Sequence, residues 1–244
     1  MRVRLWWTHG ELDPAELDGW AVAVVDCLRA TTTICAALAA GCAAVVPLEE
    51  EGAARRRAAA DGAVLAGERA CLPPPGFDLG NSPGDFRPAV VAGREVVLWT
   101  TNGSRALAKA AASQAGLVLA FALVNAAATA RHLAHADCPR LAIVCAGTEG
   151  GFALDDAFAA GALLERLSRR HGVALALDDA AGAALLLYRG AGEGARAVLD
   201  GSAAAARLRE RALEADIAFA AREDALDVVA VWESGALRAA APGA

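Results

Sequence analysis

Three segments of the chain repeat one pattern of hydrophobic and polar positions: a short apolar run, then a polar loop, then an alanine-rich stretch. The apolar runs are Ala21–Val25, Glu95–Trp99 and Leu141–Cys145. Short apolar runs without strict alternation are typical of strands that are buried on both faces, as in a parallel sheet covered by helices. The pattern therefore predicts three strand–loop–helix units.

The alanine-rich stretches predict helices that end near Ala40, cover Arg105–Ala112, and run through about Arg170. Two further apolar runs, Cys42–Leu48 and Gly116–Val124, follow the first two helices and predict additional strands. Strands that alternate with helices favour an α/β fold. We expect a three-layer α/β/α architecture in which two similar, intimately packed halves surround mainly parallel strands.

The remainder of the chain contains two helix-prone segments, Asp178–Arg189 and Ser202–Ala221, and a last apolar run, Asp227–Trp232, which could form a strand. No linker separates domains, and 244 residues fit one large domain. We therefore interpret the whole chain, residues 1 to 244, as a single domain. Its two halves would be about 1–115 and 116–244.

The composition indicates how the core packs and which classes of ligand the chain could bind. The chain is 56% hydrophobic but only 5% aromatic, so alanine-rich helices should pack closely around the sheet. The net charge is −6, and Lys109 is the only lysine. An acidic chain without a basic stripe is a poor candidate for nucleic-acid binding. A polyanionic ligand would need local positive charge from Arg, helix N-termini or a metal ion.

The sequence contains neither a membrane span nor a secretory signal. No apolar run reaches the roughly 18 residues of a membrane span without Gly or charge breaks, and Met1–Trp7 is short and interrupted by Arg2 and Arg4. We expect a cytoplasmic protein that does not bind membranes. The six cysteines form no C-x-x-C pair and lie mostly in apolar stretches, which favours buried free thiols over a zinc site or disulfides.

The loop after the first predicted strand carries the strongest candidate chemistry. Asp26 offers the hard oxygen ligands that Mg²⁺ prefers, and Arg29 offers a bidentate fork for phosphate or sulfonate. The hydroxyls of Thr31 and Thr32, with the amides of a helix N-terminus, could complete an anion site. The alternative is that Asp26 or a threonine only caps the helix while Arg29 forms a surface salt bridge.

The two other strand-end loops repeat this arrangement with different groups. Thr101 and Asn102 supply a hydroxyl and an amide, although a simple helix cap would explain the same residues. Glu149, Asp155 and Asp156 supply carboxylates, although acids are also common in the first turn of any helix. In α/β sheets, ligands bind beyond the carboxyl ends of the strands, which is where all three loops lie.

A long Pro- and Gly-rich stretch, Gly67–Pro88, interrupts the alternation of strands and helices. Ordered loops of this length are usually functional. Glu68 and Asp78 are candidates for binding a metal ion or positioning water, and Arg69 and Asn81 for binding an anion. The alternative is a set of solvated loop residues and Asx turns. We expect the loop to cover the cleft beside the strand ends.

Five strings in this chain closely resemble the 2-phosphosulfolactate phosphatase family and follow its order. The chain departs from the family pattern at two positions: the family more often has Thr at the position of Ser104 and Val at that of Cys27. Both changes are mild, because they keep the hydroxyl or the small apolar packing group. The strings span about the first two-thirds of the chain, and the last third is similar only in general character. They are DCLRATTTI (26–34), GER (67–69), GFDLGNSP (76–83), TTNGSRAL (100–107) and CAGTEGGFALDDAFAAG (145–161).

The resemblance implies an α/β/α phosphatase that requires Mg²⁺ and converts 2-phospho-3-sulfolactate to 3-sulfolactate, a step on the route to coenzyme M. Family members also occur where coenzyme M is not made. Two alternatives therefore stand beside this function: a phosphatase of another small phosphorylated acid, or a non-catalytic module that binds anions or nucleotides. Alanine-rich helices and five Trp residues also leave room for a homodimer interface.

The same resemblance, with the chemistry above, assigns roles to individual residues. Direct attack by water is favoured, because the chain lacks the D-x-D-x-T/V motif of aspartyl-phosphate enzymes. The expected catalytic residues are Asp26, Arg29 and Glu68. The expected metal ligands are Asp26 with one or more of Glu68, Asp155 and Asp156. The expected residues that bind the small phosphorylated or sulfonated acid are Thr31, Thr32, Arg69, Asn81, Thr101 and Asn102.

Overall fold

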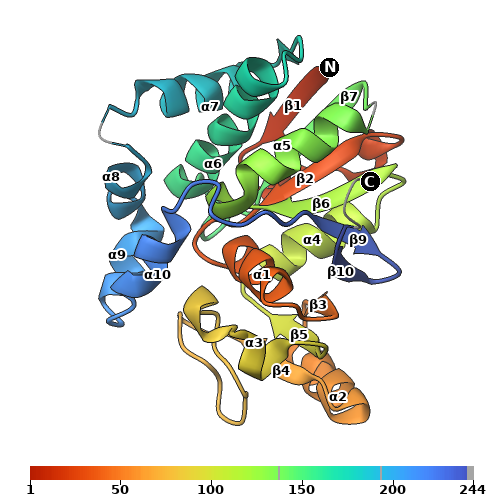
Figure 1. The fold of residues 1–244 in the computed structure, drawn as a ribbon, viewed down its shortest axis with the longest axis vertical. Helices are drawn as coiled ribbons and strands as arrows, with labels where there is room; N and C mark the ends of the chain where they lie inside the picture. Colours follow the sequence, from red (N-terminus) through yellow and green to blue (C-terminus); the bar gives the residue numbers. More distant parts are fainter. Residues whose placement is uncertain (137, 193, 241–244) are drawn as a thin grey trace.

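The computed structural model describes residues 1–136, 138–192 and 194–240. Its centre is one ten-stranded sheet with the strand order β4-β5-β3-β10-β9-β6-β2-β7-β1-β8 (Figure 1). The strands are β1 (Arg2–Trp6), β2 (Ala21–Val25), β3 (Ala44–Leu48), β4 (Val64–Gly67), β5 (Glu95–Trp99), β6 (Leu117–Phe121), β7 (Arg140–Cys145), β8 (Ala176–Leu177), β9 (Ala230–Glu233) and β10 (Ala236–Ala239).

The sheet consists of two groups of parallel strands joined by a C-terminal hairpin. One group is β4-β5-β3 and the other is β6-β2-β7-β1-β8. The hairpin β9–β10 lies between them and pairs antiparallel with β6 and with β3. Three antiparallel pairings in succession reverse the strand direction, so the two groups run in opposite directions. β2 also lies between β6 and β7, so the larger group is not consecutive in sequence.

Helices cover both faces of the sheet and confirm the three-layer prediction. Ala21, Ala23 and Val25 of β2 pack into a core with α5, α6 and α7, whereas Val22 and Val24 pack on the opposite face with α1 and α4. Because helices bury both faces of β2, all five of its residues are apolar. The longer helices are α1 (Ala30–Ala39), α2 (Glu51–Asp61), α4 (Gly103–Ala111), α5 (Ala126–His135), α6 (Leu154–Glu165) and α7 (Asp179–Gly190).

The C-terminal helices form a small group at one side of the molecule, shown in blue in Figure 1. They are α8 (Gly194–Asp200), α9 (Ala203–Arg209) and α10 (Glu214–Ala220). The prediction of one helical stretch over Ser202–Ala221 is therefore only partly correct. Ala212 has a left-handed φ of 56°, which a continuous α-helix does not allow, so the stretch divides into two helices.

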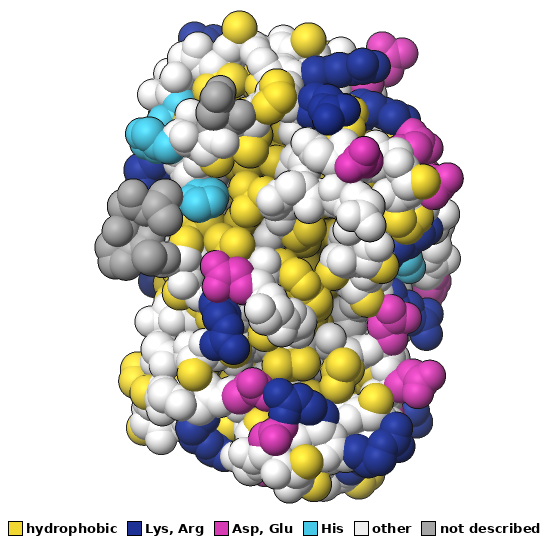
Figure 2. All heavy atoms as spheres, turned by 90° about the vertical axis from the view of Figure 1, so that its right-hand side faces the viewer, with side chains coloured by type: hydrophobic (Ala, Val, Ile, Leu, Met, Phe, Trp, Pro, Cys, Tyr) yellow, Lys and Arg dark blue, Asp and Glu magenta, His cyan; other side chains and the backbone are white. Residues whose placement is uncertain are grey.

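Shorter segments complete the chain. They are the single turn α3 (Pro88–Val91), the 3₁₀ turns η1 (His9–Glu11), η2 (Pro14–Leu17), η3 (Pro83–Asp85) and η4 (Leu123–Asn125), and the π-helical turn η5 (Arg166–Arg170) that extends α6. Figure 2 shows one face of the molecule, on which apolar side chains lie mainly in the middle and charged side chains of both signs are interspersed.

Most of the predicted elements agree with the structure, and the elements that were not predicted are short or polar. β2 and β5 begin and end at the predicted residues. The elements that were not predicted include β1, β4, β8, β10, α2, α3 and α8. Cys27, Cys35, Cys42 and Cys145 are buried free thiols, as expected. Within the described residues, no helix has both the length and the apolar character that a membrane span requires.

Candidate active site

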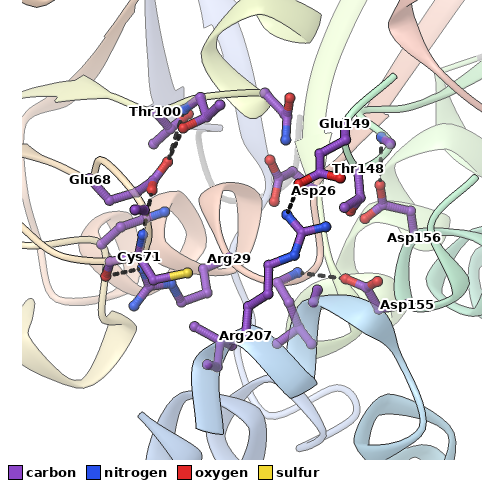
Figure 3. Close-up of a pocket in the computed structure, with 18 residues that line it drawn as sticks. Asp26, Arg29, Glu68, Cys71, Thr100, Thr148, Glu149, Asp155, Asp156 and Arg207 are labelled. Carbon is purple, nitrogen blue, oxygen red and sulfur yellow. Dashed lines mark hydrogen bonds and ion pairs between the residues drawn. The ribbon is translucent and has the colours of Figure 1, made fainter. Parts of the chain in front are cut away.

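The loops singled out in the sequence converge on one cavity of about 350 Å³ (Figure 3). The cavity is lined by the β2–α1 loop, the long loop after β4, the β5–α4 loop, the β7–α6 loop and helix α9. The lining residues used below are Asp26, Arg29, Glu68, Cys71, Asn81, Thr101, Asn102, Glu149, Asp155, Asp156 and Arg207. A volume of this size suits a small molecule.

The N-termini of α1 and α4 bring the two oppositely directed strand groups together at the cavity. α1 packs against β3, β6 and β10, and α4 packs against β2 and β3. Their first turns meet closely, because a Cβ on Gly103 would lie 2.4 Å from the Cβ of Ala30 and 2.8 Å from Oδ2 of Asp26. Only glycine allows this approach. Helices α1, α4 and α6 all begin at the cavity wall. Their N-terminal ends favour an anionic ligand.

Asp26 lies where β2 ends, and its carboxylate faces the cavity. Oδ1 accepts a hydrogen bond from the backbone N–H of Ala30 at 3.1 Å. Burial is the main cause that raises the pKa of Asp26 to about 6; the negative charge of Glu68 acts in the same direction and the Ala30 N–H in the opposite one. Oδ2 lies beside Gly103, at the junction of α1 and α4. The ionised form of this carboxylate is thus less favoured than that of an exposed aspartate.

Asp155 and Asp156 occupy the first turn of α6 and use their oxygens differently. Both oxygens of Asp156 accept backbone hydrogen bonds, from Cys27 at 2.8 Å and from Gly147 at 3.0 Å. Asp155 accepts one from Leu28 at 3.0 Å through Oδ2, while its Oδ1 is buried without a hydrogen-bond partner. Burial raises the pKa of Asp155 to about 7 and, with the charge of Asp155, raises that of Asp156. Asp156 therefore joins two loops, whereas Asp155 keeps an oxygen available.

Glu68 connects the long loop to the β5–α4 loop. Its Oε1 accepts hydrogen bonds from the N–H and the hydroxyl of Thr101, at 2.9 and 2.7 Å, and its Oε2 accepts one from the N–H of Cys71 at 3.0 Å. Asn81, from the same long loop, is buried at the cavity, and its side-chain Oδ1 has no hydrogen-bond partner. Glu68 therefore positions loops, and Asn81 retains a group for a ligand.

In the β5–α4 loop, some polar residues cap the start of α4, as the alternative interpretation proposed, and others line the cavity. The hydroxyl of Ser104 accepts a hydrogen bond from the N–H of Thr100, and the hydroxyl of Thr100 accepts one from the N–H of Ser104. Asn102 makes no side-chain cap although it precedes the first residue of α4. Its amide lines the cavity together with Thr101.

Arg29 lies at the cavity wall, but its guanidinium is committed to protein groups. It forms a buried ion pair of 2.7 Å with Asp216 of α10. The same guanidinium donates to the hydroxyl of Ser82 at 3.3 Å and to the carbonyl of Cys71 at 2.7 Å. The sequence indicated an anion-binding arginine at this position. In the structure its charge is neutralised by an aspartate 187 residues away.

Three residues expected to bind substrate are not brought into the cavity. Thr31 and Thr32 are fully buried, and their hydroxyls donate to the carbonyls of Asp26 and Cys27, because α1 begins directly after this tight loop. Arg69 points away, since its guanidinium pairs with Glu51 at 2.8 Å and stacks over the ring of Trp99. Asp78, another candidate, accepts a hydrogen bond from the N–H of Leu65 outside the cavity lining.

One residue that the sequence did not single out also lines the cavity. Arg207 of α9 lies 3.2 Å from Glu149 and forms an ion pair with it (Figure 3). Its position in an alanine- and arginine-rich helix gave no distinguishing signal, because the loops that it meets lie far away in the sequence. Only the packing of the C-terminal helices places it there.

The donor set fits a divalent cation bound by two carboxylates. Five acids and two arginines line the cavity, so negative charge is in excess. Asp155 has an unpartnered oxygen, and Oδ2 of Asp26 faces the junction of the helix N-termini. No group of three His, Cys, Asp or Glu residues is arranged as a ligand set in the described part of the chain. Mg²⁺ is commonly held by one or two carboxylates, with water and substrate oxygens as the other ligands.

The chain is similar to phosphatases along most of its length. Residues 7–235 match the sequence model described as 2-phosphosulpholactate phosphatase. A protein of Deinococcus radiodurans is 44% identical over 203 residues, which are 82% of each chain. One of Thermus thermophilus is 45% identical over 201 residues, 82% of this chain and 83% of its own. One of Caldanaerobacter subterraneus is 33% identical over 241 residues, 98% of each chain.

All three relatives carry the name "probable 2-phosphosulfolactate phosphatase". The match reaches residue 235 and therefore includes α9, α10 and β9, beyond the part of the chain that showed the resemblance in sequence. The chain belongs to the 2-phosphosulpholactate phosphatase family.

Proposed function

We propose that this protein is a Mg²⁺-dependent phosphatase that hydrolyses 2-phospho-3-sulfolactate to 3-sulfolactate and inorganic phosphate. The observation that carries the proposal is the pair of carboxylates, Asp26 and Asp155, that line one cavity at the N-terminal ends of α1 and α6. Family membership supports the reaction class. Where coenzyme M is made, the product would enter its synthesis.

The reaction requires an oxygen of water to form a bond to phosphorus while the ester P–O bond breaks. The departing alkoxide takes up a proton, and phosphate leaves with the oxygen of the water. The chain contributes little covalent chemistry to such a transfer, since positioning and charge stabilisation dominate. When bound at Asp26 and Asp155, Mg²⁺ supplies compensation for the charge on the phosphoryl oxygens.

The protein groups around the two carboxylates would hold and orient the substrate. The backbone amide at the start of α4, with the side-chain amide of Asn102, can donate hydrogen bonds to phosphoryl oxygens, whereas the N–H and the hydroxyl of Thr101 already donate to Glu68. The side-chain amide of Asn81, whose Oδ1 is unpartnered, lies on the long-loop side of the same cavity. Glu68 and Asp156 keep these loops in register through hydrogen bonds to backbone N–H groups.

Phosphate release by the purified protein tests the proposal. We expect release from 2-phospho-3-sulfolactate with added Mg²⁺, and loss of release with EDTA. Asp26→Asn should lower kcat by about 10³-fold or more without unfolding the protein, since it removes a group from the charge-stabilising centre. The exposed Asp18→Asn is the matched control and should retain activity.

Two results would overturn the proposal. If no phosphate monoester were hydrolysed under any of these conditions, the enzymatic function would be wrong and a binding module would remain. If other small phosphorylated acids were hydrolysed much faster than phosphosulfolactate, the reaction class would hold and the substrate assignment would be wrong.

A further inference from the structure

The substrate of the proposed reaction carries two anionic groups besides its phosphate, a carboxylate and a sulfonate. At least one of them needs a cationic partner in the cavity. Among the described residues that line the cavity, the arginines are Arg29 and Arg207. Arg29 is buried and held by Asp216, with further hydrogen bonds to Ser82 and Cys71, so its charge is already compensated.

Arg207 has a different environment. Its side chain is 39% exposed, and its ion pair at 3.2 Å is with Glu149, whose side chain is 80% exposed. Ion pairs between exposed groups are weak because solvent screens them. An incoming anion can therefore replace Glu149 as the partner of Arg207, because little interaction free energy is lost when the exposed ion pair breaks. Figure 3 shows Arg207 reaching from its helix toward Glu149, with Asp26 and Asp155 at the same cavity.

The helix that carries Arg207 is fixed relative to the reaction centre. The hydroxyl of Ser202 caps α9 by accepting a hydrogen bond from the N–H of Ala205, and Leu208 is buried beneath the helix. α9 packs against α10, which is anchored to the β2–α1 loop by the buried ion pair between Asp216 and Arg29. The guanidinium therefore has a defined starting position at the cavity.

The partner of Arg207 is also held in place by the backbone. Thr148 and Gly151 exchange two backbone hydrogen bonds and close a tight turn, with Glu149 at its tip. Glu149 has a φ of 53°, in the left-handed region that is uncommon for a residue other than glycine. Such conformations are concentrated at functional sites. The turn thus presents the Glu149 carboxylate to the Arg207 guanidinium at the cavity.

We propose that Arg207 determines specificity by binding the second anionic group of the phosphorylated acid, its sulfonate or carboxylate, and that Glu149 holds Arg207 at the cavity until the substrate displaces it. This inference rests on the proposed phosphatase function. It assigns to the C-terminal helices the selection of multiply charged substrates, while the strand-end loops bind the phosphoryl group.

Three phosphate esters with the phosphate on the central carbon separate the possibilities. Glycerol 2-phosphate has no second anionic group, 2-phospholactate has a carboxylate, and 2-phospho-3-sulfolactate has a carboxylate and a sulfonate. In Arg207→Gln we expect kcat/KM for phosphosulfolactate to fall about 10- to 100-fold more than kcat/KM for glycerol 2-phosphate, as for loss of a charge-assisted hydrogen bond. A matching fall with 2-phospholactate would identify the carboxylate as the bound group, and no such fall would identify the sulfonate.

Arg209→Gln is the matched control, because Arg209 lies on the same helix with the same 39% side-chain exposure and pairs with Asp200. It should leave the ratio between the substrates unchanged. Glu149→Gln should change it in the opposite direction, with kcat/KM for phosphosulfolactate rising about 2- to 5-fold, because the competing carboxylate is removed. Equal loss on all three substrates in Arg207→Gln, or no loss on any, would overturn the inference.

Calorimetric binding of 3-sulfolactate in the presence of Mg²⁺ tests Arg207 independently of turnover. We expect Arg207→Gln to weaken binding about 10-fold or more, and Arg209→Gln to leave it within about 2-fold. If the wild-type protein hydrolysed none of the esters, the proposed function would fail, but this binding comparison would still decide the role of Arg207. Equal binding by wild type and Arg207→Gln, or no binding by wild type, would contradict the inference.

Discussion

At the residue scale, the cavity contains aspartates that look alike in sequence and differ in their hydrogen bonds. Both oxygens of Asp156 accept hydrogen bonds from backbone N–H groups, so its carboxyl group joins the β2–α1 and β7–α6 loops. Asp155 accepts one N–H group and has a second oxygen that is buried without a partner. An unpaired buried oxygen destabilises the fold and is retained where it serves a ligand.

The two adjacent carboxylates should therefore respond oppositely to neutralisation. For Asp155→Asn at pH 8 without metal, we expect a melting temperature raised by about 2–4 °C, which corresponds to about 1 kcal/mol in a chain of this size. The amide oxygen can still accept the Leu28 N–H, and the buried charge is removed. Activity should be lost together with the stabilisation by Mg²⁺. Thermal melts and phosphate release measure the two effects.

Asp156→Asn should instead destabilise the protein by about 1–3 kcal/mol, because one of the two N–H groups would then face an amide NH₂. Asp179→Asn is the control, since Asp179 is an exposed acid in the first turn of α7. If Asp155→Asn lowered the melting temperature as much as Asp156→Asn does, the assignment of Asp155 as the available ligand would be wrong.

At the scale of elements, α10 is connected to the β2–α1 loop by the buried Arg29–Asp216 ion pair, with Ser82 of the long loop as a third member. These three segments are far apart in the sequence. The pair therefore fixes the C-terminal helices relative to the loops that line the cavity. Removing one charge leaves the other buried without a partner, which typically costs about 3–5 kcal/mol.

We expect Asp216→Leu to reduce the free energy of unfolding by about 3–5 kcal/mol, and the double change Arg29→Met with Asp216→Leu to recover part of that loss. Urea denaturation of both variants measures the difference. Arg196→Ala breaks an exposed ion pair with Asp200 and should change stability by less than about 1 kcal/mol. A double variant no more stable than Asp216→Leu would show that the hydrogen bonds of Arg29 to Ser82 and Cys71 outweigh its charge.

At the scale of the whole molecule, the raised carboxylate pKa values couple stability to pH and to metal binding. The pKa of Asp26 is raised to about 6 and that of Asp155 to about 7, both chiefly by burial. Between the unfolded value of about 3.9 and these folded values, the folded chain holds protons that the unfolded chain releases. The contribution of these groups to stability is therefore present below about pH 4 and lost as pH rises to about 7.

Without metal, we expect the difference in melting temperature between wild type and the Asp26→Asn, Asp155→Asn double variant to grow from pH 5 to pH 8, with wild type the less stable. Mg²⁺ should stabilise wild type more at pH 8 than at pH 5, because protons compete for the same oxygens. Melts across this pH range, with Mg²⁺ or with EDTA, measure both effects. An equal Mg²⁺ shift at pH 5 and pH 8 would argue against these carboxylates as the ligands.

The sequence by itself determined the local elements and the chemistry attached to them. Apolar runs such as Ala21–Val25 and Glu95–Trp99 form strands whose two faces are buried. The polar loops lie at the strand ends because each strand ends where its apolar run ends. The sequence therefore predicted that Asp26 and Asp155 lie at one edge of the sheet, whereas Asn102 follows a strand of the oppositely directed group. Hydrophobic periodicity is a local property of the sequence. The polar residues of the loop between a strand and the next helix are local in the same sense.

Only the tertiary structure decided which of these groups are available to a ligand. The hairpin β9–β10 reverses the sheet, and α1 and α4 then bring the two strand groups to one cavity. Asp216 neutralises Arg29 and Glu149 meets Arg207 across long stretches of chain. Sequence spacing carries no information on such contacts, because they depend on how whole elements pack. The first two strand-end loops and the acids of the third thus line one cavity, and α9 from the C-terminal helices completes its wall.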